Sequence, residues 1–344
     1  MASPDEEKAI VLYHYSTSPY ARRIAWYLAL RGIPYAQCMQ PPVMPRPDVA
    51  KLGVAHRRIP ILSIGRDVYL DTRLMLRKLE SIYPSRPRLG ASKPDQAALE
   101  RLLEALTIDG GVFSNAINLL PTSLPMLRDP AWFKDRSGYA GVKLSAEVME
   151  RNKPQAVNEV RRHMEFLETT LLADGRDWVL KTDGPGLADI EAVWLVHWLS
   201  GIPGALPKEH ISAEKFPKVF AWIVRFQKAL STAKKAAPKV KTVSGDEAAE
   251  IIISSPYNEP QEHVDPQDAL VAAEGLKSDD VVVVWPTDTG ASHKDSGKLV
   301  SINGDEVVIE VNGEKGSVRV HAPRHGFRVE KLERFKERRR STKL

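Results

Sequence analysis

Near its N-terminus the chain carries three dipeptides whose order and spacing constrain the fold more than any other feature of the sequence. They are Ser18-Pro19, Ile59-Pro60 and Asp71-Thr72. A serine suits a helix N-cap and a proline suits the first helical turn, where no amide donor is needed. The second dipeptide suits a backbone bend at the proline, and the third suits the start of another helix. We call these three dipeptides fixed points, and the segments between them decide how they are arranged in space.

These segments read as alternating strands and helices. Residues 11–13 form a short β-prone apolar run, and a helical apolar pattern follows up to Gly32, which suits a helix end. The stretch 58–70 predicts a hairpin, and 71–84 places its apolar side chains on one helical face. We therefore expect a compact α/β domain over residues 1–85.

This arrangement resembles the N-terminal domain of the glutathione S-transferase family over residues 9–85. That family places a Ser, Cys or Tyr near the first helix, then a cis-proline strand, then an acidic-hydroxyl pair that opens a helix. Here Ser18, Pro60 and the pair Asp71-Thr72 occupy those positions. Isoleucine replaces the more usual valine before the proline, and Asp-Thr replaces Glu-Ser. The resemblance implies a thioredoxin-like fold with glutathione as co-substrate and no metal.

The groups of glutathione suit the residue types found at these positions. Asp71 suits the γ-glutamyl ammonium, and Thr72 with the free amides of a helix start suits the neighbouring carboxylate. Ile59, before a cis Pro60, would offer its backbone to the cysteinyl unit. Arg58 would meet the glycyl carboxylate. The alternatives for that last role are His56 and Arg57. Taken alone, the Asp-Thr pair would also serve as an ordinary helix cap.

Ser18 is the candidate catalytic residue, acting on the thiol of glutathione. A thiol with a pKa near about 8.5 is mostly protonated at neutral pH, so catalysis requires a group that stabilises the thiolate. A hydroxyl donor at the positive end of a helix does this without acting as a nucleophile. Tyr13 and Ser16 lie close in sequence and are alternative donors.

The middle of the chain, residues 92–235, reads as all helix and resembles the helical C-terminal domain of the same family. Its segment 186–201 is apolar nearly all round, as expected of a central buried helix. Gly186 stands at the cap where the family usually has Ser or Thr, and Asp189 in the first turn is expected to support folding. Candidates for the lining of a second-substrate pocket are Phe113, Trp132 and Tyr139.

The remaining residues are not explained by the family. Residues 236–278 read as a linker with one short helix, and 279–332 contain several short β-prone segments separated by Asn-Gly turns. We expect a small, SH3-like β-barrel domain there, and a basic tail over 333–344. This likeness is architectural and carries no function by itself.

Composition limits the partners and the cellular compartment that we expect for this protein. The single cysteine, Cys38, cannot form an internal disulfide and is expected to be a buried structural thiol. A formal net charge of +5 is too mild to favour nucleic acid as a partner. No apolar stretch approaches the length of a membrane span, and the acidic N-terminus does not resemble a secretory signal. We expect a cytoplasmic protein. The final Thr-Lys-Leu differs by one residue from a peroxisomal address, which makes the peroxisome an alternative.

The resemblance implies an enzyme that activates the thiol of glutathione for attack on a small electrophilic substrate, and the family usually forms homodimers. Two other functions fit the same sequence. One is a non-catalytic scaffold of the same fold that binds a ligand or protein. The other places the function in the added β-rich segment and basic tail, as an adaptor.

Overall fold

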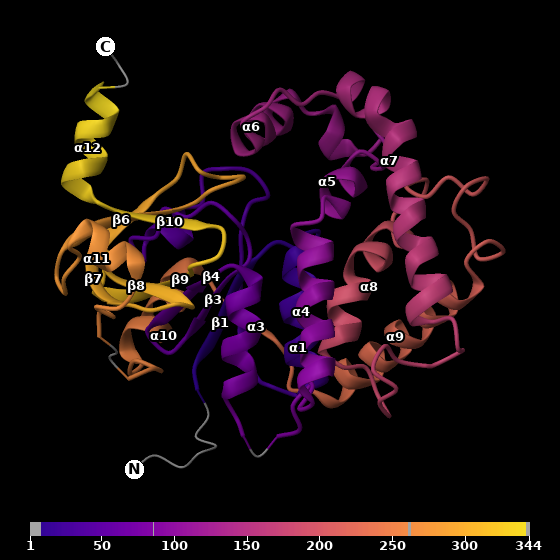
Figure 1. Cartoon of the computed structure of the whole chain (residues 1–344), viewed down its shortest axis with the longest axis horizontal. Coiled ribbons are helices and arrows are strands. Elements are labelled where there is room, and N and C mark those ends of the chain that lie inside the picture. The colour runs from indigo at the N-terminus through magenta and orange to yellow at the C-terminus, as the bar shows by residue number, and fades with distance from the viewer. Residues whose placement is uncertain (1–7, 85, 261–262, 342–344) are drawn as a thin grey trace.

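The computed structural model describes residues 8–84, 86–260 and 263–341. Strands and helices alternate at the N-terminus, helices follow, and strands return at the C-terminus (Figure 1). The N-terminal elements are β1 (Ile10–His14), α1 (Pro19–Leu30), β2 (Ala36–Met39), α2 (Pro47–Ala50), β3 (Ile61–Ile64), β4 (Asp67–Leu70) and α3 (Thr72–Ser81). The predicted α/β order of this domain is confirmed.

A helical region separates the two groups of strands. Its helices are α4 (Pro94–Ile108), α5 (Val112–Ile117), a 3-10 turn η1 (Pro125–Arg128), α6 (Pro130–Ala140), α7 (Ala146–Phe166), a π turn η2 (Leu167–Leu171), α8 (Leu187–Ser200) and α9 (Pro217–Ala236). The expected buried helix is α8. Its Asp189 accepts hydrogen bonds from the Val179 amide at 3.0 Å and the Trp222 indole at 2.9 Å, so it supports folding as expected. None of the described helices is both long and apolar enough to cross a membrane.

The described part of the last third of the chain contains six further strands and three helices. Its elements are β5 (Lys241–Thr242), α10 (Gly245–Ser254), α11 (Ala269–Glu274), β6 (Val281–Pro286), β7 (Asp295–Ile302), β8 (Glu306–Asn312), β9 (Ser317–Pro323), β10 (Phe327–Lys331) and α12 (Leu332–Ser341). The predicted helix in the linker is α10, which begins at the N-cap Ser244. The terminal Thr-Lys-Leu lies outside the described residues.

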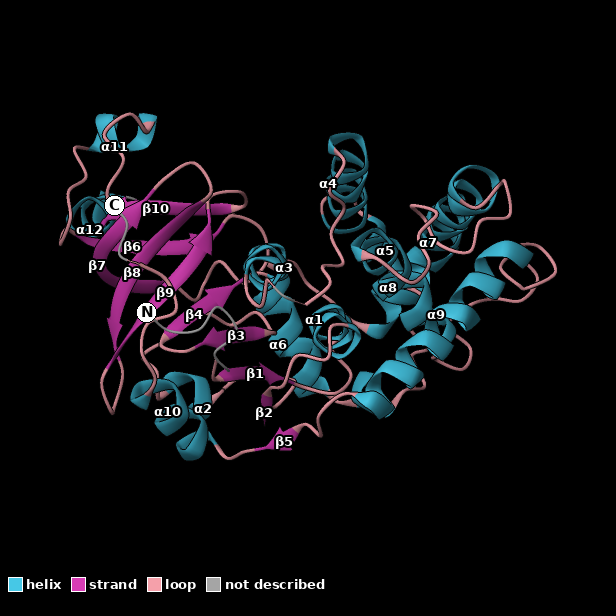
Figure 2. Cartoon of the chain, turned by 90° about the horizontal axis from the view of Figure 1, so that it is seen from below, coloured by secondary structure: helices cyan, strands magenta, loops and turns pink. Residues whose placement is uncertain are grey.

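The ten strands of the described residues form one sheet, in the order β10-β6-β7-β8-β9-β4-β3-β1-β2-β5. The junction is a parallel pairing of β4 with β9, in which Val68 lies opposite Val320. The strands predicted within residues 279–332 are therefore present and extend the N-terminal sheet (Figure 2), but the pairing of the described strands does not show the SH3-like barrel expected there. Hairpin turns in the sequence indicate that strands exist, but they do not indicate which edge of another sheet the strands join.

Strands β1, β3 and β4 pack against a different core on each of their two faces, because successive side chains along a strand point in opposite directions. Ile10 and Leu12 belong to the core formed with α1, α3 and the helical region. Val11 and Tyr13 belong to the core shared with α10 and the C-terminal strands. The C-terminal residues thus complete a core that the N-terminal strands begin.

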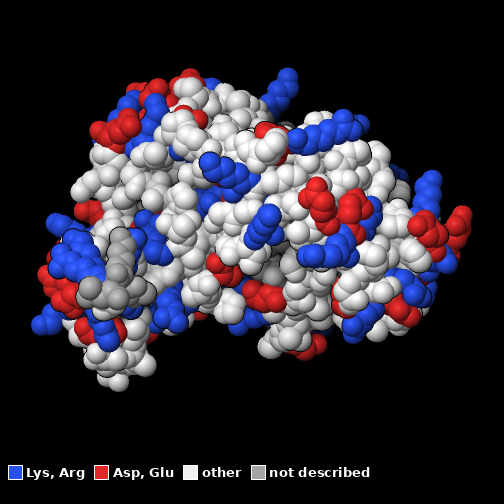
Figure 3. All heavy atoms as spheres, turned by 90° about the horizontal axis from the view of Figure 1, so that it is seen from above, with Lys and Arg blue, Asp and Glu red and all other residues white. Residues whose placement is uncertain are grey.

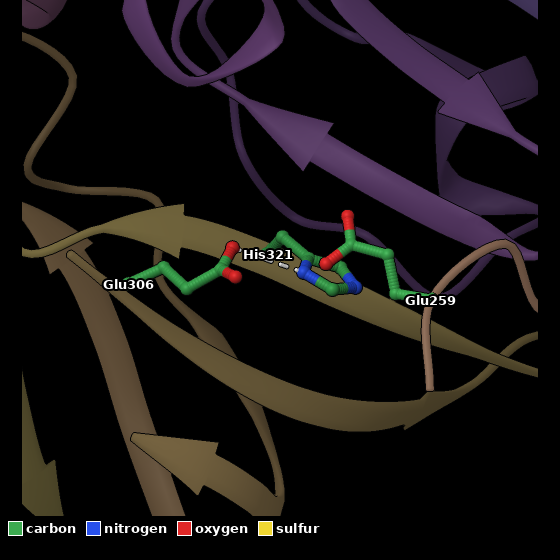
Figure 4. A group of neighbouring side chains, drawn as sticks. All are labelled: Glu259, Glu306 and His321. Atoms are coloured by element: carbon green, nitrogen blue, oxygen red, sulfur yellow. Dashed lines mark hydrogen bonds and ion pairs between the residues drawn. The ribbon is translucent and has the colours of Figure 1, made fainter. Parts of the chain in front are cut away.

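A buried polar network fixes the junction of β4 and β9. The His321 ring lies between two carboxylates, with its Nε2 3.0 Å from Oδ1 of Asp67. On its other side, Nδ1 lies 3.1 Å from Oε2 of Glu306 (Figure 4). Lys78 of α3 contacts both Glu259 and Glu306, at 2.5 Å and 2.6 Å. The network joins α3 and β4 to three segments of the C-terminal region. It therefore ties that region to the N-terminal domain.

We expect the free energy of unfolding to fall as the pH rises from 6.5 towards 9. Burial alone would lower the pKa of His321, but its hydrogen bonds to Asp67 and Glu306 raise the pKa from 6.5 to about 9. The stabilisation is therefore complete below pH 6.5 and is lost as the pH passes through the folded pKa; the difference corresponds to about 3 kcal/mol at most. Urea denaturation at both pH values measures it. An equally steep decline in His321→Gln would contradict this assignment.

Candidate active site

The three predicted fixed points have the expected local structure. Ser18 is the N-cap of α1, and its Oγ accepts a hydrogen bond from the Ala21 amide at 3.2 Å. The peptide bond between Ile59 and Pro60 is cis. Asp71 is the N-cap of α3 and has a φ of 68°, a left-handed backbone that is costly for a residue with a Cβ. A strained residue at the start of a helix is typical of a functional position.

Contacts between the elements bring these points together near the central strands β3 and β4 of the sheet. Arg23, in the second turn of α1, donates to the Thr72 hydroxyl at the start of α3. The Arg58 guanidinium lies 3.8 Å from Oδ2 of Asp71, so the residue before Ile59 also reaches α3. Tyr20, two residues after Ser18, is within electrostatic range of both Asp71 and Arg58. The predicted binding residues Arg58, Asp71 and Thr72 therefore face the first turns of α1.

Asp71 is surrounded by cations. Its Oδ1 accepts from the Arg73 amide at 3.0 Å and its Oδ2 lies 3.1 Å from the Arg73 guanidinium. Burial alone would raise the pKa of Asp71, but Arg73 and Arg58 together lower it to about 2. The carboxylate is thus charged at neutral pH, as recognition of an ammonium group requires. Arg73 is a partner that the sequence pattern did not single out.

A loop from the C-terminal region covers Arg58. Residues 287–294 join β6 to β7, and within this loop Asp288 pairs with the Arg58 guanidinium. The Thr289 carbonyl accepts from Nε of Arg58 at 2.9 Å. The Gly290 amide donates to the Tyr139 carbonyl of α6 at 2.8 Å. The loop therefore bridges the N-terminal domain and the helical region, and it contacts Arg58 where a bound carboxylate was expected.

Glycine is required at position 290 for this close approach. Its φ is +77°, and an added Cβ would lie 3.2 Å from Cγ of Arg57 and 3.4 Å from a ring carbon of Tyr139. Both the backbone conformation and the lack of space disfavour any other residue. The loop is consequently fitted to the surface that it covers.

The turn between β9 and β10 approaches the other side of the site. Nε2 of His325 lies 3.2 Å from the Asp109 carboxylate, which also accepts from Arg73 at 3.0 Å. Phe327, at the start of β10, stacks on the His56 ring with centroids 5.8 Å apart and lies under the Arg58 guanidinium. Two C-terminal segments thus border a site built from the N-terminal domain.

The alternatives to Arg58 have other environments. Arg57 donates to Oδ1 of Asp135 at 2.9 Å and packs over the Tyr139 ring, so its charge is already paired. His56 is buried, and neither ring nitrogen has a hydrogen-bond partner among the described residues. Burial and the nearby Arg58 lower the pKa of His56 to about 3, so it is neutral at pH 7. Arg58 is also paired, but its partner Asp288 is an exposed loop residue. Asp135 is largely buried with Arg57, so Arg58 is the better suited of the two arginines to exchange its partner for another carboxylate.

The alternatives to Ser18 are also separated by the structure. The Tyr13 side chain is buried in the core on the opposite face of the sheet, near Cys38 and Asp48, and burial raises its pKa further above 10. Tyr13 is thus remote from the predicted binding residues. Ser16 lies exposed in the turn before α1. Ser18 alone combines an N-cap position with burial, at 1% exposed.

The candidates for a second-substrate pocket do not form one group. Phe113 packs against Tyr20 and Trp194, with ring centroids 4.8 Å and 5.7 Å away. Trp132 is buried against Phe133 in α6. Tyr139 borders the loop over Arg58. Phe113 and Tyr139 therefore lie near the α1 end of the site, whereas Trp132 is a core residue of its own helix.

One group of described residues has the composition of a metal site. Glu259, Glu306 and His321 bring ligand atoms within 4.8 Å of one another at the β4–β9 junction. The Lys78 ammonium already contacts both carboxylates, so this group carries its own cation. Cys38 is buried as expected, and burial together with Asp48 raises the pKa of its thiol to about 12.

Comparisons with known proteins agree with this architecture. Residues 12–87 match the glutathione S-transferase N-terminal domain, and residues 115–235 match a domain of unknown function (DUF7962). Glutathione S-transferase U1 of Arabidopsis thaliana is 20% identical over 239 residues, which are 70% of this chain and 93% of that protein. Glutathione transferase GST 23 of Zea mays is 20% identical over 67% of this chain and 90% of its own length.

Solved structures share the fold. A GST-like protein from Pseudomonas syringae aligns with a TM-score of 0.66 and 24% identity over 95% of this chain and 100% of its own. A rice enzyme in complex with glutathione aligns with a TM-score of 0.50 and 18% identity over 72% of this chain and 96% of its own. Coverage of 95% means that the likeness to the Pseudomonas protein extends into the C-terminal strands.

Proposed function

Because the N-terminal domain of this chain belongs to the glutathione S-transferase family, we propose that the protein binds glutathione and activates its thiol for attack on a small electrophile. The observation that carries this proposal is the convergence of Arg58, Asp71 and Thr72 on the first turns of α1, which begins at Ser18. Arabidopsis and maize relatives with glutathione transferase names, and a rice structure that contains glutathione, support the same ligand.

Each residue has a role that follows from its chemistry. Asp71, charged and buried, would pair with the γ-glutamyl ammonium, and the Thr72 hydroxyl and the α3 amides would receive its carboxylate. The Ile59 backbone before cis Pro60 would pair with the cysteinyl unit. Arg58 would receive the glycyl carboxylate.

Ser18 would stabilise the thiolate. Its oxygen already accepts from the Ala21 amide, and no described residue accepts a hydrogen bond from its hydroxyl, so the O–H is available as a donor. The positive end of α1 adds to the stabilisation. With a side chain only 1% exposed, the hydroxyl becomes accessible to a thiol only when the covering groups move.

A second function, a non-catalytic scaffold of the same fold, is favoured by the pairing already present in the site. Asp288 and the Thr289 carbonyl engage Arg58, Arg73 engages Asp71, and Arg23 engages Thr72. A protein whose C-terminal loop permanently fills the glycyl end of the site would keep the fold without binding glutathione. The two functions differ in whether the loop can be displaced.

Titration of the protein with glutathione, followed by calorimetry and by the ultraviolet band of the thiolate, tests the proposal. We expect binding with a thiolate band at neutral pH. Ser18→Ala should raise the pKa of the bound thiol while changing affinity little, and Ser16→Ala, the matched control in the same turn, should leave both unchanged. Asp288→Ala should strengthen binding severalfold, because it removes a competing carboxylate from Arg58.

Two results would contradict the proposal that the protein is an enzyme. If glutathione binds to neither the wild type nor the Asp288→Ala variant, the non-catalytic scaffold is favoured. Binding with an unshifted thiol in both the wild type and Ser18→Ala would assign a ligand site without activation.

A further inference from the structure

A hollow lies between strands β6 and β10 and the last helix, and it shares the β6–β7 loop with the partners of Arg58. Its volume is about 510 Å³. It is lined by Trp285 of β6, Ser292 and Lys294 of the β6–β7 loop, Arg328 of β10, and Phe335, Arg338 and Arg339 of α12. Four of these seven side chains are cationic and two are aromatic. This volume lies within the range of about 300–1,000 Å³ that is usual for ligand pockets.

The aromatic side chains form the base of the hollow and support its cations. The rings of Trp285 and Phe335 lie 5.5 Å apart, and each residue is 8% exposed. The Lys294 ammonium lies 4.7 Å from the Trp285 ring centre, and the Arg338 guanidinium lies 5.4 Å from that of Phe335. Cation–π contacts of this kind position charged groups without neutralising them.

Positive charge is concentrated around this hollow. Residues 324–341 contain eight Lys and Arg and three Glu, a net charge of +5 that equals the net charge of the whole chain. Figure 3 shows Lys and Arg atoms gathered at the left end of the molecule, with some acidic atoms among them. Glu330 pairs with Arg338 at 2.8 Å and offsets one of the four lining cations.

The lining cations repel one another. Burial lowers the pKa of Lys294, and the charges of Arg338 and Arg339 lower it further. A negatively charged ligand in the hollow would relieve this repulsion and would find guanidinium groups that bind carboxylates through two parallel hydrogen bonds. The electrostatic complement of the hollow is therefore an anion with several charges.

We propose that this hollow and the basic face of α12 form a docking site for an acidic segment of a partner protein. Arg334 of this helix pairs with Glu274 of α11, but Lys336 and Arg340 continue the positive charge beyond the hollow, so the complementary ligand is extended. Single-stranded nucleic acid would need exposed aromatic faces on which its bases stack. Here both rings are buried beneath cations, which favours carboxylate side chains over bases. The site is separate from the glutathione residues and does not depend on their proposed function.

Fluorescence anisotropy with labelled octaglutamate and the full-length protein at low salt tests the site. We expect saturable binding that Arg338→Ala combined with Arg339→Ala weakens at least tenfold. Alanine favours helix, so α12 should persist in this variant, which circular dichroism checks. The matched control is Arg161→Ala with Arg162→Ala, an adjacent arginine pair exposed on α7, which should change affinity less than twofold.

The same assay contains the results that would overturn the proposal. Equal weakening by both arginine pairs would mean general attraction to a basic protein. Tighter binding of octathymidylate than of octaglutamate would assign the surface to nucleic acid. Lack of measurable octaglutamate binding by the wild type would reject the site.

Discussion

Replacing Arg23 with alanine is expected to lower the free energy of unfolding by about 3–5 kcal/mol, the usual cost of leaving a buried charge unpaired. The Arg23 guanidinium is fully buried in α1 and pairs with Glu191 of α8, which is 1% exposed. It also donates to the Thr72 hydroxyl, so one side chain links two helices of the N-terminal domain to the helical region. Burial raises the pKa of Glu191 to about 7, and Arg23 opposes that rise. Urea denaturation measures the loss.

Two further variants separate charge from packing. Arg22→Ala removes the neighbouring, half-buried arginine of the same helix and should change the free energy of unfolding by less than about 1 kcal/mol. Arg23→Met combined with Glu191→Leu should recover most of the stability, because no buried charge is left alone. A double variant as unstable as Arg23→Ala would show that the arginine acts through its shape and its Thr72 contact.

Deleting all residues after Ala237 is expected to abolish soluble folding. On the face of the sheet that packs against the C-terminal strands, five fully buried side chains would be exposed: Val11, Tyr13, Ile61, Val68 and Leu70. Burial of one such side chain contributes about 1.5–3 kcal/mol, so the loss is of the order of 10 kcal/mol. That matches the entire stability of a typical domain, about 5–15 kcal/mol. The deletion also leaves the edge of β4 unpaired, which promotes aggregation.

The soluble fraction after expression and the binding of a hydrophobic dye measure this effect. The matched control is a deletion from Leu332 onward, which removes α12 but keeps every strand and should remain soluble. A truncated protein that is soluble and unfolds cooperatively would show that the N-terminal and helical regions fold without the added strands. Such a protein would then be the right one in which to measure glutathione binding without the covering loop.

Local features of this fold were predictable from the sequence. An N-cap acts on amides within three residues, so Ser18 and Asp71 could be assigned from their immediate neighbours. The apolar residues on nearly every side of α8 likewise identified a buried helix, and the hairpin of β3 and β4 followed from its turn. The proposed ligand-binding residues belong to these same local elements, so their positions at the helix starts could be predicted.

Contacts across long stretches of chain were not predictable. Nothing near Arg58 indicates that Asp288, 230 residues later, pairs with it. His321 and Asp67 are 254 residues apart, and only the β4–β9 pairing makes them neighbours. A carboxylate needs any nearby cation, and a strand edge accepts any complementary strand, so residue type alone does not choose the partner. For this reason, neither the joining of the C-terminal strands to the N-terminal sheet nor the covering of Arg58 by the β6–β7 loop could be predicted from the sequence.

The β4–β9 pairing also has a consequence for how the protein is made. Asp67 lies opposite Arg319, so the two halves of the junction leave the ribosome 252 residues apart. At a synthesis rate of roughly 5–20 residues per second, the edge of β4 and its apolar face stay uncovered for roughly 10–50 seconds. Helices α1–α9 are synthesised well before β9 can pair with β4. The nascent chain therefore passes through a long interval in which this apolar face is open to aggregation, and slow translation of the last hundred codons would lengthen that interval.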